Sequence, residues 1–342
     1  MSQKTKRTTL KRYPYGFFFR LWGLVHRYRR FLVTTHVRPD GDAVGSSVAL
    51  SLFLRNLGKE VVFALEEPLD KKYAFLSETS RVEVWQEDKP VPSVDVAFVL
   101  DSGDISRIGE IQSWLGSAIV VNIDHHKDNT LFGSLNWVDA TASSVGEMLV
   151  RWLGGKVEGE IAQALFLSLA TDTGFFRFSN ASPSVYRMAA SLLERGASQT
   201  LVYEHIYQNR PFGFLLLLER LLGHLELHHD GKLCIGYVSF EDMKETNCYD
   251  TEGLLEYLAL IEGVEVYVLL KEKEKGKISV SFRTRTDYYD MSEVAREFGG
   301  GGHTKAAGCS LEGDIHSWRG QILEATARYM MGKEVKGQER FW

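Results

Sequence analysis

Apolar runs of strand length recur through the first half of the chain, and several end directly in acidic or histidine residues. The predicted strands are at residues 31–35, 60–65, 94–100 and 118–123. Helical periodicity between them, at 43–57 and 105–115, predicts an α/β fold with a mostly parallel sheet covered by helices on both faces. In such sheets ligands bind beyond the carboxyl ends of the strands. The polar residues that follow these runs are therefore predicted to meet in one crevice.

Helical patterns continue after the last of these strands. They lie at 143–153, 159–170 and 184–195. Gly196 follows the last of them, as a helix C-cap would. We therefore expect a catalytic domain at 1–196, whose first 30 residues form a basic extension, followed by a helical linker at 197–226.

A second, smaller α/β domain is predicted at 227–335. Its expected strands are 233–240, 264–271 and 277–283, and its expected helices are 291–298 and 315–331. Residues 271–276 alternate Lys and Glu before a glycine, which predicts a solvated hairpin turn without a chemical role.

Charge is distributed unevenly along the sequence. Residues 1–39 contain ten Lys and Arg residues and no acid, which leaves 30 basic and 45 acidic residues in the rest. An acidic body argues against binding of duplex DNA, which requires a basic face. The basic start is predicted to be a solvated, partly disordered N-terminus, with contact to a phosphate backbone or membrane surface as the alternative.

Cysteine usage and hydropathy suggest the compartment. Cys234, Cys248 and Cys309 are widely spaced, and no C-x-x-C is present, so neither a disulfide framework nor a thiolate zinc site is predicted. The longest apolar stretch, 212–218, is too short to span a membrane. We expect a soluble protein of the reducing cytoplasm.

The segment His36-x-x-x-Asp40-x-Asp42 follows the first strand. Pro39 and Gly41 impose a tight turn that aims its side chains inward. One imidazole and two carboxylates suit Mn²⁺, with Mg²⁺, Co²⁺ and Zn²⁺ as alternatives. The competing interpretation is that an Asp here only caps the helix that follows.

Three further positions extend this cluster. Asp101 follows the next strand, where a carboxylate can bridge two metals about 4 Å apart or simply cap a helix. In the run Asp124-His125-His126, one imidazole is expected to bind metal and the other to contact substrate, while Asp124 orients a ring. Asp172 follows a largely apolar helix, so its burial demands either a metal or a partner such as Arg177.

A glycine-rich segment in the second domain, predicted to be a loop, is the last chemical candidate. It contains Gly300, Gly301 and Gly302, followed by His303 and Lys305. Consecutive glycines let backbone N–H groups approach an anion, although the spacing fits neither a P-loop nor a dinucleotide fingerprint. Arg283 and Arg285 leave the preceding strand, and either can pair with a phosphate.

Taken in order, these segments resemble the DHH phosphoesterase family, in particular the oligoribonuclease/pAp phosphatases, or nanoRNases, with a DHH-associated C-terminal domain. The resemblance covers roughly residues 20–330. It implies one Mn²⁺ held by His36, Asp40 and Asp101, and a second held by Asp42, Asp101, His125 and Asp172. It also implies that His126 acts on the scissile phosphate or the leaving oxygen, and that Arg283, His303 and the 300–302 backbone hold the terminal phosphate. The sequence 284–286 departs from the family pattern, which leaves the choice between Arg283 and Arg285 open.

The expected reaction is metal-assisted hydrolysis of two- to five-nucleotide RNAs to mononucleotides and of pAp to AMP. Short single-stranded RNA and small nucleotides are the expected substrates. The sequence leaves open whether the protein forms a homodimer. Alternatives within the enzyme class are a cyclic-di-AMP or pApA phosphodiesterase, a manganese pyrophosphatase and a RecJ-like exonuclease. A nucleotide sensor without catalysis is the alternative from another class.

Overall fold

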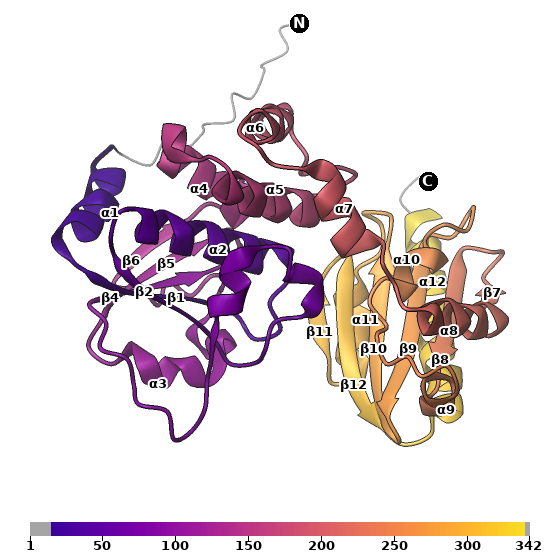
Figure 1. Cartoon of the computed structure of the whole chain (residues 1–342). Helices are drawn as coiled ribbons and strands as arrows, with labels where there is room; N and C mark the ends of the chain where they lie inside the picture. The colour runs from indigo at the N-terminus through magenta and orange to yellow at the C-terminus, as the bar shows by residue number, and fades with distance from the viewer. Residues whose placement is uncertain (1–14, 339–342) are drawn as a thin grey trace, which may run out of the picture. The chain divides into compact units, whose positions relative to one another are not determined.

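A computed structural model describes residues 15–338 of the chain (Figure 1). The basic residues of the predicted N-terminal extension up to Arg12 lie outside this range. The chain forms two compact units, which meet in the sequence between Asn209 and Arg210. No helix among residues 15–338 is both long enough and apolar enough to cross a bilayer.

The first unit is built on a six-stranded sheet in which every neighbouring pair is parallel. In spatial order its strands are β3 (Glu83–Val84), β2 (Glu60–Leu65), β1 (Arg30–Thr35), β4 (Val96–Leu100), β5 (Ile119–Asp124) and β6 (Leu135–Val138). Their interiors are nearly continuous in Val, Ile, Leu and Phe, as expected for a parallel sheet buried on both faces. The predicted α/β fold class is confirmed.

Helices cover both faces of this sheet (Figure 1). One face carries α2 (Gly41–Asn56), α4 (Val145–Leu153) and α5 (Glu160–Asp172), which share a large apolar core with the strands. On the other face, α3 (Gln112–Leu115) and the turn before it pack Ile108, Ile111 and Trp114 against β1 and β4. The other helices of the unit are α1 (Tyr15–Arg27), α6 (Pro183–Glu194) and α7 (Gln199–Tyr207).

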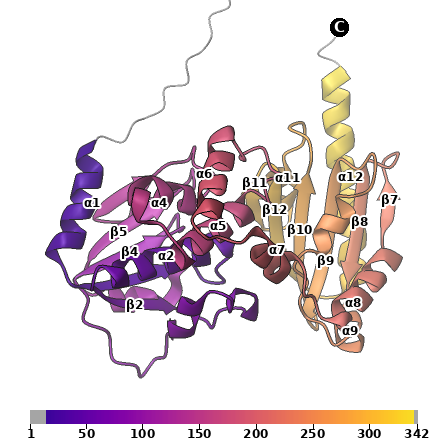
Figure 2. The same ribbon diagram turned by 45° about the horizontal axis from the view of Figure 1, so that its top comes forward.

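The second unit contains another six-stranded sheet, which is mixed. Its strands, in spatial order, are β11 (Gly301–His303), β12 (Ala306–Glu312), β10 (Lys277–Thr284), β9 (Val266–Glu274), β8 (Leu233–Val238) and β7 (Glu226–His228) (Figures 1 and 2). Only β8 and β9 run parallel, and the other pairs are antiparallel. Its helices are α8 (Phe212–Gly223), α9 (Phe240–Glu245), α10 (Leu254–Leu258), α11 (Met291–Glu297) and α12 (Ile315–Gln338).

The two helices of the predicted linker pack on different units. Val202 and Ile206 of α7 belong to the core of the first unit, whereas Phe214, Leu217 and Leu221 of α8 belong to a core of the second. The unit boundary therefore falls inside the segment 197–226.

Three local predictions differ from the structure. The segment 105–115 is not one helix. Gly109 adopts φ +57° and breaks the 3-10 stretch Ile105–Ile111 in its interior, and the four-residue α3 follows that stretch directly. The segment 271–276 is not simply a turn, because β9 continues to Glu274. The glycine-rich segment is not wholly a loop, because Gly301–His303 forms the edge strand β11 on β12.

Candidate metal centre

Polar side chains converge at the carboxyl ends of the three central strands of the first sheet. His36 follows β1, Asp101 follows β4, and Asp124 is the last residue of β5. Asp40 caps α2 by accepting hydrogen bonds from the backbone N–H groups of Asp42 (3.0 Å) and Ala43 (3.1 Å). The capping role and the candidate ligand role thus fall to the same carboxylate, since capping uses only its Oδ1.

One group of potential metal ligands consists of His36, Asp40 and Asp101. One ligand atom from each lies within 4.8 Å of the others. His36 Nδ1 is 2.9 Å from the carbonyl oxygen of Val37, and a carbonyl only accepts, so Nδ1 carries the hydrogen. In the neutral ring the lone pair is therefore on Nε2, which lies 3.6 Å from Asp101 Oδ2. This Nδ1–H tautomer is the one in which Nε2 can bind a metal.

A second group consists of Asp42, His125 and Asp172, again with ligand atoms within 4.8 Å of one another. His125 Nε2 lies 3.2 Å from Asp172 Oδ2 and 3.4 Å from Asp101 Oδ1. Asp101 therefore faces both groups. Arg177, the alternative partner for Asp172, instead donates to the carbonyl oxygen of Gly174 at 2.7 Å.

Asp101 provides the direct test of whether a cation fits. Its side chain is buried, and its Oδ1 accepts no hydrogen bond within the described residues, although His125 Nε2 lies 3.4 Å away. Its backbone adopts φ +51°, a left-handed conformation that costs a non-glycine residue free energy and recurs at functional sites. A buried carboxylate oxygen without a donor is costly unless a cation binds it, so these residues fit a divalent metal.

The side chains of both groups shift one another's pKa values, because they are buried close together. Burial and the nearby charge of Asp101 raise the pKa of Asp42 to about 7. Burial and the charge of Asp42 also raise the pKa of Asp172 well above its usual range. Burial alone would lower the pKa of His125, but Asp101, Asp42 and Asp172 outweigh it and raise that pKa to about 10. Without a cation, the cluster therefore holds protons that a bound metal would displace.

Asp42 is fixed by the packing of three helices. Its carboxylate accepts from the backbone N–H groups of Val145 (2.7 Å) and Gly146 (3.2 Å) at the start of α4, and from the hydroxyl of Ser168 on α5. A side chain at Gly146 would overlap Ser168, so this approach requires glycine.

His126 forms a third candidate ligand group with Asp101 and His125, and it also belongs to a hydrogen-bond chain of its own. Its Nδ1 lies 2.7 Å from Asp124 Oδ1, so the carboxylate orients this ring rather than that of His125. The Asn129 amide in turn donates to Asp124 Oδ2 (2.5 Å) and Asn122 Oδ1 (2.8 Å). Hydrogen bonding to Asp124, against the opposing effect of burial, raises the pKa of His126. Asn129 was not predicted from the sequence, although its place five residues after Asp124 within one short loop was a usable signal.

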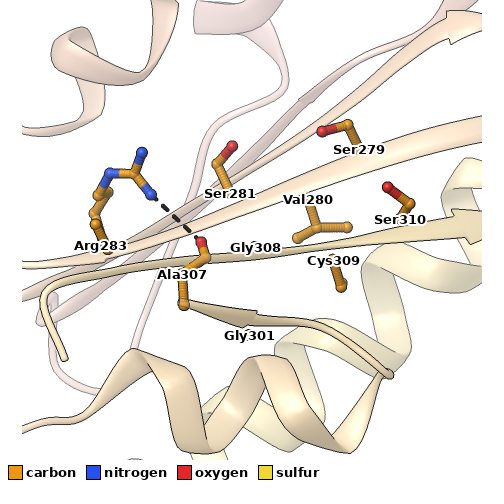
Figure 3. Close-up of a pocket in the computed structure, with 10 residues that line it drawn as sticks. Ser279, Val280, Ser281, Arg283, Gly301, Ala307, Gly308, Cys309 and Ser310 are labelled. Atoms are coloured by element: carbon orange, nitrogen blue, oxygen red, sulfur yellow. Dashed lines mark hydrogen bonds between the residues drawn. The ribbon is translucent and has the colours of Figure 1, made fainter. Parts of the chain in front are cut away.

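The second unit brings together only some of its predicted residues. Arg283 on β10 donates to the carbonyl oxygens of Phe282 (3.0 Å) and Ala307 (3.3 Å), and it lines a hollow with Gly301 (Figure 3). Arg285 is exposed beyond the strand end and reaches the carbonyl oxygen of Ile261 at 3.5 Å. Lys305 pairs with Asp287 at 2.8 Å. The geometry thus favours Arg283 over Arg285 for contact with an anion in this hollow.

His303 and the glycines lie at the edge of the same sheet. Gly301 pairs with Gly308, and His303 pairs with Ala306, so β11 places the imidazole one strand beyond β12. At Gly300, a side chain would overlap Gly308 and Cys309. Close strand packing therefore explains Gly300 and also Gly302, where a side chain would overlap Ala306 and Ala307. It does not explain Gly301, where a side chain would meet no neighbour.

Comparison with known proteins gives both units a family. Residues 30–170 match the DHH family N-terminal domain, and residues 230–330 match the DHHA1 domain. The chain is 34% identical to the bifunctional oligoribonuclease and PAP phosphatase NrnA of Thermus thermophilus, over 86% of this chain and 88% of that protein. It is 28% identical to the protein of the same name from Bacillus subtilis, over 85% and 91% of the two chains.

A solved structure supports the fold. An exopolyphosphatase-related protein from Bacteroides fragilis superposes with a TM-score of 0.86, covers 93% of this chain and 98% of its own, and is 23% identical. Both domain models occur in the order predicted, and a relative with 34% identity spans most of the chain. The chain therefore belongs to the DHH family of phosphoesterases, among the members that carry a DHHA1 domain.

Proposed function

We propose that this protein is a two-metal phosphoesterase that hydrolyses RNAs of two to five nucleotides to mononucleotides and pAp to AMP. The observation that carries the proposal is a pair of adjacent ligand groups, His36/Asp40/Asp101 and Asp42/His125/Asp172. Asp101 of the first group lies 3.4 Å from His125 Nε2 of the second. The names of the relatives from Thermus thermophilus and Bacillus subtilis support the choice of substrates.

The proposed ligands are His36, Asp40 and Asp101 for one ion, and Asp42, Asp101, His125 and Asp172 for the other. We infer Mn²⁺ for both, because mixed imidazole and carboxylate ligands suit it. When bound, such ions lower the pKa of water and neutralise charge on the phosphoryl oxygens.

His126 is the proposed proton donor. Because its Nδ1–H is held by Asp124, only Nε2 is available to substrate. The raised pKa favours the imidazolium, which can donate from Nε2 to the oxygen that leaves phosphorus. Asp124 holds the ring in place and stabilises its positive charge.

Arg283, His303 and the 300–302 backbone are the proposed contacts for the substrate phosphate away from the reacting bond. Arg283 is half-buried and forms no ion pair within the described chain, so its guanidinium is available to an anion. Lys305 is a weaker candidate, since Asp287 already neutralises it.

The test is product release by the purified chain with Mn²⁺ on five substrates: pApA, a five-nucleotide RNA, pAp, cyclic-di-AMP and pyrophosphate. We expect mononucleotides from the first three and little product from the other two. Dominant turnover of cyclic-di-AMP would assign second-messenger degradation instead. Tight binding without turnover under any divalent metal would indicate a sensor.

A further inference from the structure

One face of the second sheet is covered on half its width and open on the other half. Over β8 and β9, Cys234, Val238 and Leu269 pack under α8, α9 and α10. Over β10 and β12, the same face carries Ser279, Ser281 and Arg283 on one strand and Gly308 and Ser310 on the other. Figure 3 shows the three serines and Arg283 projecting from one side of the sheet, while Ala307 and Cys309 project from the opposite side.

The alternation along β10 produces this polar row. Val280 and Phe282 point into the core beneath α11 and α12, so Ser279, Ser281 and Arg283 must point away from it. None of the three serine hydroxyls forms a hydrogen bond within residues 15–338. The other residues of this face that line the hollow are Arg283, Gly301, Ala306 and Gly308. Three free hydroxyls along an open hollow indicate a surface built for a polar ligand.

Lys271 adds a second cation at the far end of the row. It lies directly opposite Ser279 in the β9–β10 ladder, so both side chains share one face. Lys271 and Arg283 are half-buried, and among the described residues neither forms an ion pair. Glu256 on α10 is the carboxylate whose charge acts on both, without a direct contact, and burial lowers the pKa of each cation.

Spacing along the strand separates the two cations into distinct contacts. Ser279 and Arg283 are four residues apart along β10, or about 13 Å at about 3.3 Å per residue. Because the row extends over this distance, its two ends can contact different phosphates of one oligonucleotide. The serines between them bridge the gap with groups that can donate to phosphate oxygens.

We propose that Lys271, Ser279 and Ser281 form a second anion subsite, which binds a phosphodiester of the substrate beyond the phosphate held by Arg283. The inference rests on the proposed function and deepens it: this face selects oligonucleotides long enough to reach Lys271. Substrates with fewer phosphates leave the subsite empty.

The experiment compares Lys271→Met with the unaltered protein on pAp, pApA and a five-nucleotide RNA under Mn²⁺. We expect kcat/KM for the pentamer to fall about tenfold, the value of one charge-assisted contact, with pAp and pApA unchanged. The dependence of log kcat/KM on log salt should lose a slope of about 0.7 for the pentamer alone. Lys244→Met, which removes an exposed lysine paired with Glu241, is the matched control.

Each outcome bears on a different claim. Equal losses on all three substrates, or no loss on the pentamer, would overturn the subsite. Absence of turnover of any substrate by the unaltered protein would instead overturn the proposed function. Retained pAp turnover shows that Lys271→Met is folded. If it is lost, Ser279→Ala, an exposed position, should reduce pentamer turnover selectively, and a uniform or absent effect there would overturn the subsite.

Discussion

The strand ends of the first sheet and the open face of the second sheet have opposite electrostatic designs. In the first, the carboxylates of Asp40, Asp42, Asp101, Asp124 and Asp172 gather around the imidazoles of His36, His125 and His126. Burial and the charge of Asp101 raise the pKa of Asp42 to about 7. In the second, Arg283 and Lys271 share a face with serine hydroxyls and have no ion pair within the described chain. The difference indicates that one region is built to hold cations and the other to hold anions.

The free-energy cost of burying like charges together explains why each region needs its own ligand. Carboxylates brought together in a low-dielectric crevice repel one another unless a cation binds between them. Half-buried cations without a carboxylate partner have lost part of their hydration, and a bound anion compensates for that loss. A phosphate ester substrate with metal ions satisfies both regions, which is why the comparison supports a phosphoesterase.

Removing the shared carboxylate should have the largest effect. Asp101→Ala should lower kcat by at least about a thousandfold with every substrate, because both ligand groups lose a member. Steady-state kinetics under saturating Mn²⁺ measure it. Asp104→Ala removes the half-buried cap of the next turn and its hydrogen bond from Thr130, but no member of either ligand group, so it should retain turnover. Near wild-type kcat in Asp101→Ala would break the two-metal account.

Removing a cation from the second sheet should weaken substrate binding while leaving metal binding intact. Arg283→Gln should raise KM about ten- to a hundredfold with a smaller change in kcat, since the lost contact lies away from the reacting bond. Arg285→Gln, at an exposed position, is the control and should change little. A larger rise in KM for Arg285→Gln than for Arg283→Gln would assign the phosphate contact to Arg285, beyond the strand end.

The hydrogen-bond chain behind His126 should have an intermediate effect. Asn129→Ala frees one oxygen of Asp124 and loosens the imidazole, so kcat should fall about tenfold, with KM little changed. Single-turnover measurements separate this from product release. A change confined to KM would assign Asn129 to substrate binding instead.

The smallest effect is the pH dependence of metal affinity. Without metal, the pKa of His125 is about 10 and that of Asp42 about 7, so both carry protons at and below neutral pH. Metal binding must displace them, so Mn²⁺ affinity should rise with pH by up to about tenfold per unit for each proton released. Calorimetry in two buffers of different ionisation enthalpy measures the release. Binding without proton uptake by the buffer would show that these groups are not ligands.

The sequence predicted the first region better than the second for a physical reason. Strand ends in a parallel sheet converge by topology, so His36, Asp101 and His125 could be placed together from their positions after apolar runs. Asn129 was missed because its hydrogen bond to Asp124 depends on how the loop after β5 folds back. The left-handed backbone of Asp101 leaves no mark in the sequence.

The second region depends on alternation and pairing, which were harder to predict. Glycine has low strand propensity, so Gly301–His303 was expected to be a loop rather than the edge strand β11. Lys271 was placed where the predicted strand 264–271 ends and a solvated turn begins, yet β9 continues to Glu274 and Lys271 is half-buried. The period-two row of Ser279, Ser281 and Arg283 was present in the sequence, but only the sheet shows which face is open.

The central claim is that the first region holds two ions that share Asp101, and the most direct test is the Mn²⁺ stoichiometry of the purified chain, measured together with its electron paramagnetic resonance spectrum. The account predicts two Mn²⁺ per chain with magnetic coupling between them, an unchanged count in Arg283→Gln, and at most one ion in Asp101→Ala. A single ion in the unaltered protein, or two uncoupled ions that survive Asp101→Ala, would contradict it.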